Sequence, residues 1–256
     1  MKKINFADAA ELKLIGNEAF YSCRALPEAL IPNSVSYLGH SAFAYNYALA
    51  KVNIPEVKTI SHSTFQACIA LTDVYIPESV KTIEKFAFMD CSHLTNLTGR
   101  ENVETYGESC FARTNLHLDS RAAIEFSAST RSIDEKAFEG LPLEEVIVHM
   151  DTPIAINENT FNSDVYETAT LIVPKGAKEL YKTAATWSLF KNIVGEDEDL
   201  NEPNEDEEIE VNGINEITNS DASVQNRYGL NGQMTNGKGL NIIRMSNGQV
   251  RKVMVK

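Results

Sequence analysis

The sequence is poor in several features that would assign it to a common class of protein. None of its apolar runs approaches the roughly 18 residues that a membrane-spanning helix needs. Only four of its 256 residues are cysteines, and no two form a C-x-x-C pair, so neither a disulfide scaffold nor a zinc site is indicated. Basic residues are also scarce, 23 against 36 acidic ones, and the net charge of −13 argues against binding to a nucleic-acid backbone.

The motifs of the common active sites are missing as well. The chain contains no G-x-G-x-x-G, P-loop or H-E-x-x-H motif, and the run at 107–111 (GESCF) departs from G-x-S-x-G at its last position. We therefore interpret the protein as non-enzymatic and expect no catalytic residues, no cofactor and no bound metal.

The acidic residues are concentrated in one stretch. Ten of the 36 lie between Glu196 and Glu210, where no lysine or arginine occurs. Such a segment cannot bury enough apolar surface to fold, and its like charges repel one another into an extended tether. The charge pattern thus predicts three parts: a folded region at 1–195, an acidic linker at 196–210 and a C-terminal segment at 211–256.

Seven of the eleven phenylalanines share one register. Separated by 23, 22, 23, 23, 27 and 23 residues, they are Phe20, Phe43, Phe65, Phe88, Phe111, Phe138 and Phe161. An aliphatic residue or a tyrosine stands five positions before each of the first six, at Ile15, Leu38, Ile60, Ile83, Tyr106 and Ile133. Self-similarity at this period indicates a repeat architecture.

Each unit also carries a short apolar alternation, clearest in V-N-I-P at 52–55 and V-Y-I-P at 74–77. The first and third residues of this pattern share the buried face of a strand, and proline ends the strand because it cannot donate to a ladder. A unit of 22–27 residues cannot bury its own apolar face, so about seven units must stack. The predicted fold is an α/β repeat, a β-rich solenoid with a parallel sheet and with short turns or single helical turns on the convex side.

Two units depart from the pattern. In the fourth, Gly99 occupies the position of the strand isoleucine. The fifth is expected to place its strand at 116–118, and an insertion within 119–130 would then explain the spacing of 27 residues.

The last unit has the character of a terminus. Residues 177–194 are expected to form a closing cap, beginning with a short helix at 177–187 that carries Leu180, Ala184 and Trp187 near one face. Trp187 is the only tryptophan in the chain, and we expect it to cover the end of the stack.

The repeat resembles the BspA-like leucine-rich repeats. The runs at 15–23 (IGNEAFYSC) and 74–80 (VYIPESV) match the I-G-x-x-A-F-x-x-C and V-x-I-P blocks of that subfamily almost letter for letter, and the resemblance covers residues 12–194. It implies a leucine-rich-repeat solenoid and a cell-surface or secreted adhesin whose partner is a host extracellular-matrix or plasma protein. The alternative is a structural or spacer module of a larger surface assembly, or a glycan-binding module.

The two ends of the chain bear on its location. Ile4 and Phe6 look like the remnant strand of a preceding unit, so we expect further sequence upstream, with a signal peptide.

Asn-Gly pairs between apolar residues after position 228 predict a few β-strands with tight turns. This segment resembles the C-terminal sorting domains of type IX secretion in its Y-x-L-x-G run at 228–232 and its K-V-x-V-K ending at 252–256, although Leu240 and Asn241 stand where an aromatic residue is more usual. A small β appendage without a sorting role is the alternative.

A protein partner is expected to bind the strand residues that point away from the core, because solenoids use such extended surfaces for recognition. The candidate residues, called the outward face below, are Lys51, Asn53, Asp73, Tyr75, Asn96, Thr98 and His117. Tyr75 is the predicted centre, since it lies in the best-matched repeat and has no core to fill. The alternative is that these residues are merely solvated.

Three of the four cysteines recur at one position of the repeat, three residues after phenylalanine, as Cys23, Cys68 and Cys91, whereas Cys110 directly precedes Phe111. Recurrence in register favours small buried residues over reactive ones. All four are predicted to be buried and unpaired.

Overall fold

The computed structural model describes Ile4, Phe6, residues 11–117 and 121–196, and three C-terminal strands at 224–229, 239–245 and 250–255. These residues belong to two compact units, one within 1–202 and the other within 203–256. Within the described part of the chain, no helix is long and apolar enough to cross a membrane.

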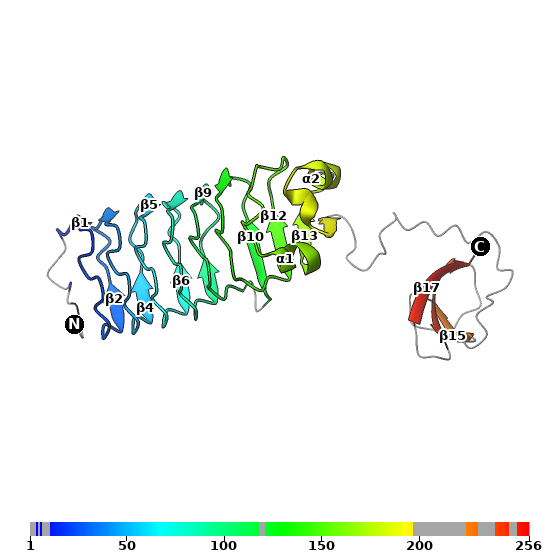
Figure 1. Ribbon diagram of the computed structural model, residues 1–256, viewed down its shortest axis with the longest axis horizontal. Helices are drawn as coiled ribbons and strands as arrows, with labels where there is room; N and C mark the ends of the chain where they lie inside the picture. The colour runs from blue at the N-terminus through cyan, green and yellow to red at the C-terminus, as the bar shows by residue number, and fades with distance from the viewer. Residues whose placement is uncertain are drawn as a thin grey trace. The chain divides into compact units, whose positions relative to one another are not determined.

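The first unit is a solenoid with two rows of parallel strands (Figure 1). The first row consists of β2 (Glu28–Leu30), β4 (Lys51–Asn53), β6 (Asp73–Tyr75), β8 (Asn96–Thr98), β10 (Ala123–Phe126), β12 (Glu145–Val148), β13 (Thr170–Val173) and β14 (Asn192–Gly195). The second row consists of two-residue strands, β1 (Leu14–Ile15), β3 (Tyr37–Leu38), β5 (Thr59–Ile60), β7 (Thr82–Ile83), β9 (Thr105–Tyr106) and β11 (Ser132–Ile133). The predicted parallel-sheet solenoid is confirmed, and the second row is an addition to it.

Paired strands bring equivalent residues of successive units side by side. Val74 of β6 pairs with Leu97 of β8, and both are buried. Asp73 and Tyr75, on either side of Val74, are exposed, while Ile76 is buried again. The alternation predicted from the V-x-I pattern is therefore present, and it gives every strand of this kind one core face and one outward face.

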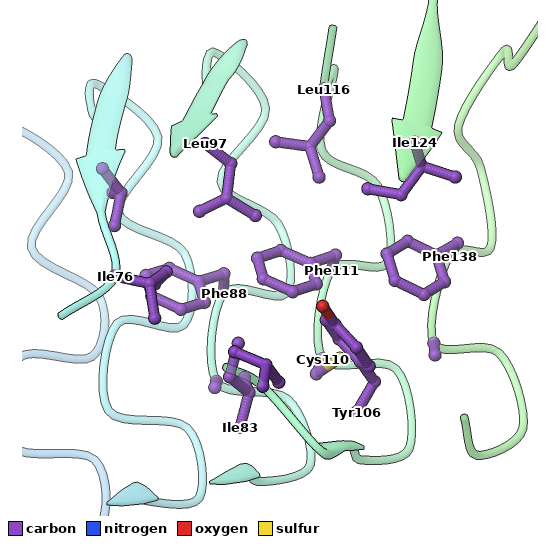
Figure 2. Close-up of a cluster of buried hydrophobic side chains, with 14 of the residues drawn as sticks. Ile76, Ile83, Phe88, Leu97, Tyr106, Cys110, Phe111, Leu116, Ile124 and Phe138 are labelled. Carbon is purple, nitrogen blue, oxygen red and sulfur yellow. The ribbon is translucent and has the colours of Figure 1, made fainter. Parts of the chain in front are cut away.

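A column of phenylalanine rings forms the centre of the core. Consecutive rings from Phe20 to Phe161 have centroids 5.1–5.8 Å apart and interplanar angles of at most 20°. Figure 2 shows part of this column, with aliphatic residues of the two strand rows on either side of it. Fully burying one such side chain stabilises the fold by about 1.5–3 kcal/mol, and stacking adds about 0.5–1.5 kcal/mol.

The turns that carry the first six phenylalanines, from Phe20 to Phe138, have a repeating left-handed backbone. The residues two positions before and two positions after Phe65, Ser63 and Ala67, have φ of 55° and 56°. The same conformation recurs at Glu18, Ser22, Ser41, Tyr45, Phe86, Asp90, Ser109, Arg113 and Lys136. It costs about 1–2 kcal/mol per residue. It also directs N–H groups to the next unit, since Ser63 N–H donates to the Lys85 carbonyl at 3.1 Å and Ala67 N–H to the Met89 carbonyl at 2.8 Å, which offsets that cost.

The fifth strand of the first row lies later in the chain than predicted. It is β10, inside the stretch expected to be an insertion, and its Ile124 pairs with Val146 of β12. From the predicted segment at 116–118, only His117 pairs, through a single bridge to Asn96. The prediction is right in part, since His117 pairs with β8 and Leu116 is buried in the core, but it missed the strand β10. L-H-L at 116–118 and A-I-E-F at 123–126 both have the strand alternation, and unit length alone did not show that both segments join the stack.

The C-terminal cap also differs in detail. After α1 (Ser163–Thr168) and β13, the helix α2 spans only Lys178–Thr183, and a 3-10 helix follows at Trp187–Leu189. Leu180, predicted to face the core, is 50% exposed, because the helix places Tyr181 there instead. Trp187 is buried as expected: it stacks on Phe190 with centroids 6.1 Å apart and donates Nε1–H to the Ile154 carbonyl at 2.7 Å.

The second unit contains a three-stranded antiparallel sheet, β15 (Val224–Gly229), β16 (Gly239–Met245) and β17 (Val250–Val255). The small β segment predicted at the C-terminus is thus present. The predicted acidic linker at 196–210 lies outside the described residues, apart from Glu196.

Replacing Phe88 with alanine should lower the free energy of unfolding by about 3–5 kcal/mol. Phe88 is fully buried, and its ring is stacked between Phe65 and Phe111 at 5.4 and 5.2 Å, so truncation leaves a cavity that neither neighbour can fill. Urea denaturation followed by circular dichroism measures the change.

Phe86→Ala is the matched control, because Phe86 lies in the same turn but is only partly buried. Its truncation should cost about 1 kcal/mol. Equal destabilisation by the two variants would contradict the assignment of the stability to the ring column.

Candidate functional site

The outward face extends over β4, β6 and β8, of which β6 and β8 are paired. Five of its seven predicted residues are exposed, namely Lys51, Asp73, Tyr75, Asn96 and Thr98, and the other two, Asn53 and His117, are half-buried. Asp73 pairs with Asn96 and Tyr75 with Thr98, which makes these four residues neighbours. Tyr75 has the largest exposed aromatic surface among the described residues, at 55%.

Asp73 carries a fixed negative charge beside Tyr75. Thr72 Oγ1 donates to Asp73 Oδ2 at 2.6 Å, and Asn96 Nδ2 donates to Asp73 Oδ1 at 3.0 Å. Both hydrogen bonds favour the ionised carboxylate, first that from Thr72 and then that from Asn96, and they lower the pKa of Asp73.

Asn53 has a structural function that the sequence did not indicate. Its Oδ1 accepts the N–H of Ile31 and its Nδ2 donates to the Ile31 carbonyl, both at 2.6 Å. The amide therefore extends the pairing of β2 and β4 by one residue, much as a backbone peptide would. Because both polar atoms of its side-chain amide already bond Ile31, Asn53 is poorly placed to bind a partner.

The first row is interrupted after β8. By hydrogen bonding the row divides into three sheets, β2 with β4, β6 with β8, and β10 with β12, β13 and β14. His117 forms a bridge with Asn96 and therefore lies beside Asn96 rather than beside Thr98. The outward position equivalent to Thr98 is occupied instead by Glu125, which pairs with Ile147.

Arg100 fills the interruption. The residue is only 8% exposed; its Nη1 donates to the Leu97 carbonyl of β8, and its Nε donates to the Glu125 carbonyl of β10 at 3.2 Å. Where strands of the row are paired, N–H groups of the neighbouring strand bond such carbonyls. A buried carbonyl without a donor costs about 1–3 kcal/mol, so the guanidinium substitutes for the missing strand contacts.

Gly99 explains how the chain turns into this position. It has φ of 78°, and a Cβ there would lie 2.2 Å from the Ile76 carbonyl oxygen and 2.6 Å from Cε2 of Tyr75. Only glycine therefore fits where the other units place isoleucine. The close approach also shows that the ring edge of Tyr75 lies directly against Gly99.

A cavity of about 300 Å³ opens at the interruption. Its polar wall comes from both sides of the break and includes Thr98, Arg100, Glu101, Glu125, Ser127 and His149. Gly99 also lines the cavity, and the ring of Tyr75, which is not itself a lining residue, lies against Gly99. The volume is at the lower end of the range for small-ligand pockets.

A carboxylate–imidazole–carboxylate chain runs along one side of this cavity. His149 Nε2 lies 2.7 Å from Glu125 Oε1, and His149 Nδ1 lies 2.9 Å from Glu196 Oε1. These contacts hold the Glu125 side chain in position. Within the described residues, no group of three or more His, Cys, Asp or Glu side chains could hold a metal ion.

Arg100, Glu125 and His149 were not among the predicted site residues. Their contacts join units across the break, and the break could be located only once β10 was known to lie at 123–126. The spacing of 27 residues between Phe111 and Phe138 was the one available indication that this unit differs from its neighbours.

The cysteine position has a hydrogen-bonding function. Cys68 Sγ donates to the Phe43 carbonyl at 3.2 Å and Cys91 Sγ to the Phe65 carbonyl at 3.1 Å, each in the preceding unit. Asn46, which fills the same position, donates to the preceding unit in the same way. The position thus requires a small buried donor, in agreement with a structural role for the thiols.

All four cysteines are unpaired, as predicted, and Cys68, Cys91 and Cys110 are buried. Cys23 is only half-buried, which corrects the prediction for this residue. Burial raises the pKa of Cys68 to about 12 and also raises those of Cys91 and Cys110.

Iodoacetamide should alkylate Cys23 at least tenfold faster than the other three thiols in the native protein at pH 8. The thiolate is the reactive form, and at the three buried positions both the raised pKa and the lack of access suppress it. Peptide mass spectrometry over a time course gives the four rates. Alkylation of Cys68 as fast as Cys23 would contradict the burial, whereas in urea all four should react.

Solved structures similar to this chain are leucine-rich repeat proteins. One from Bacteroides ovatus ATCC 8483 is 20% identical, with a TM-score of 0.53 over 72% of this chain and 52% of that one. A leucine rich cell surface protein from Faecalibacterium prausnitzii A2-165 is also 20% identical, with a TM-score of 0.33 over 74% of this chain and 52% of that one. The chain thus spans about half the length of these proteins, and the first likeness supports the fold. No curated protein matches the chain.

The repeat itself matches a known family. The BspA type leucine rich repeat region is found in six copies, over residues 13–120 and 117–195. These residues include the phenylalanine column and both strand rows of the solenoid. The chain therefore belongs to the BspA-type leucine-rich repeat family.

Proposed function

We propose that this protein is a cell-surface or secreted adhesin that binds a host extracellular-matrix or plasma protein through the outward face. The observation that carries the proposal is the exposed ring of Tyr75 at the centre of this face. Tyrosine is enriched among the residues that dominate binding energies at protein interfaces. A ring held on a rigid strand also loses little conformational entropy on binding.

The surroundings of Tyr75 suit such an interface. The exposed side chains of Asp73, Asn96, Thr98 and Lys51 form a polar rim around the ring. Asp73 and Asn96 are already held by hydrogen bonds, so their geometry is preorganised. The family supports a repeat protein of the cell surface, and the C-terminal β unit is proposed to act as a type IX sorting domain that delivers the solenoid there.

Tyr75→Ala should weaken binding to the protein partner about thirtyfold, which corresponds to a loss of about 2 kcal/mol. An exposed strand residue contributes little packing, so the free energy of unfolding should change by about 0.5 kcal/mol. A panel of immobilised extracellular-matrix and plasma proteins, read by surface plasmon resonance, first identifies a partner and then gives the Kd of each variant.

Tyr37→Ala is the matched control, since Tyr37 is 46% exposed but belongs to β3 in the second row. It should bind like the unsubstituted protein. Equal binding by the two variants would remove Tyr75 from the interface, and the absence of any partner in the panel would favour the spacer module.

A chain that ends at Glu196 should keep the thermal midpoint of the full chain to within about 2 °C. The proposed linker is too strongly charged to compact, so the C-terminal unit should not stabilise the repeats. Ending at Glu196 preserves its contact with His149. Differential scanning calorimetry of both chains measures the midpoint, and a fall of about 10 °C would contradict the proposed division into independent parts.

A further inference from the structure

We infer that the cavity at the sheet interruption binds a single neutral sugar ring, with Tyr75, whose ring lies against the lining residue Gly99, as a stacking surface beside the cavity. This goes beyond the proposed function, because a free sugar can occupy the cavity without a protein partner. The inference depends on three properties of the site: unused hydrogen-bonding groups, a balance of charge, and an aromatic ring in contact with a residue of the cavity wall.

The guanidinium of Arg100 has donors to spare. Of its five N–H groups, one on Nε and one on Nη1 bond the Glu125 and Leu97 carbonyls. Among the residues that the structure describes, Nη2 has no acceptor and Arg100 has no carboxylate partner. Arg100 as a whole residue is 8% exposed and lines a cavity without an ion pair. This arrangement is unusual, because buried charges are normally paired.

The opposite wall supplies an acceptor. Glu125 Oε1 is held by His149 at 2.7 Å, whereas no described residue donates to Glu125 Oε2. A donor of Arg100 and an acceptor of Glu125 thus line the same cavity without pairing to each other. Neighbouring hydroxyl groups of a sugar satisfy such a pair, since one hydroxyl accepts from the guanidinium while the other donates to the carboxylate.

The charges of the site favour a neutral ligand. Arg100 would repel a cation, and the carboxylates of Glu101 and Glu125 in the wall, with Glu196 behind His149, would repel an anion. The remaining polar groups, the hydroxyls of Thr98 and Ser127, are neutral and can both donate and accept. This composition suits a polyhydroxyl compound better than a phosphate or a carboxylate.

The size of the cavity and the aromatic ring beside it point to one sugar ring. A volume of about 300 Å³ is at the small end for ligand pockets and suits one ring rather than an oligosaccharide. The Tyr75 ring lies against Gly99 in the cavity wall and is otherwise largely exposed. An aromatic face binds the apolar C–H face of a sugar ring while the polar wall binds its hydroxyls.

The test uses the full chain and methyl glycosides of glucose, galactose, mannose and N-acetylglucosamine, with methyl glucuronide and inorganic phosphate as anionic counterparts. Saturation-transfer NMR and calorimetric titration give binding and Kd. At least one neutral glycoside should bind saturably with a Kd of about 1 mM or lower, more tightly than either anion. Failure of every neutral glycoside to saturate, or tighter binding of an anion, would overturn the inference.

Variants localise the binding. Tyr75→Ala, Glu125→Gln and Thr98→Phe, which fills the cavity from an exposed strand position, should each raise the Kd for the glycoside at least tenfold. Tyr37→Ala should leave it unchanged, and circular dichroism melts confirm that each variant is folded. Unchanged affinity in both Glu125→Gln and Thr98→Phe would place the sugar elsewhere and overturn the inference. Protein binding that depends on Tyr75 would still support the proposed function in that case, so the two failures are distinguishable.

Discussion

One aromatic ring per unit, stacked on the ring of the unit before it, is the contact on which the rest of the solenoid depends. The rings from Phe20 to Phe161 lie 5.1–5.8 Å apart, close to the separation of paired strands. Because the column and the strands have nearly the same repeat distance, both can be satisfied at once. The left-handed residues on either side of the first six phenylalanines bring the turn into the same register.

Much of this architecture could be predicted from the sequence because it is periodic. The spacing of the phenylalanines and the alternation around Val74 each specify a local geometry that every unit repeats. The outward direction of Tyr75 followed from that alternation alone. Where the period changes, at the unit between Phe111 and Phe138, the prediction was incomplete. The segment at 116–118 does pair with β8 through His117, but β10, which pairs with β12, lies in the stretch that was expected to be an insertion.

The cavity could not be predicted for a related reason. Arg100 contacts Glu125, and Glu125 contacts His149, across separations of 25 and 24 residues that bring them together only when β10 begins at Ala123. Asn53 shows a further limit, because its alternation places it outward and gives no indication that its amide is bonded to Ile31. Pattern reasoning gives the face on which a residue lies, whereas its available hydrogen bonds depend on neighbours one unit away.

The interruption affects only one of the two strand rows. The second row continues past it, since β9 pairs with both β7 and β11, whereas no described pairing joins β8 to β10 and the side chain of Arg100 bonds a carbonyl of each. A stack that is continuous along one edge and open along the other has the geometry of a hinge. Phe111 and Phe138 are in contact at 5.8 Å at this point, so the ring column is continuous where such a hinge would bend. Such bending would widen or narrow the mouth of the cavity and would turn Tyr75 relative to His149, so the curvature of the solenoid and the shape of its polar pocket are mechanically linked.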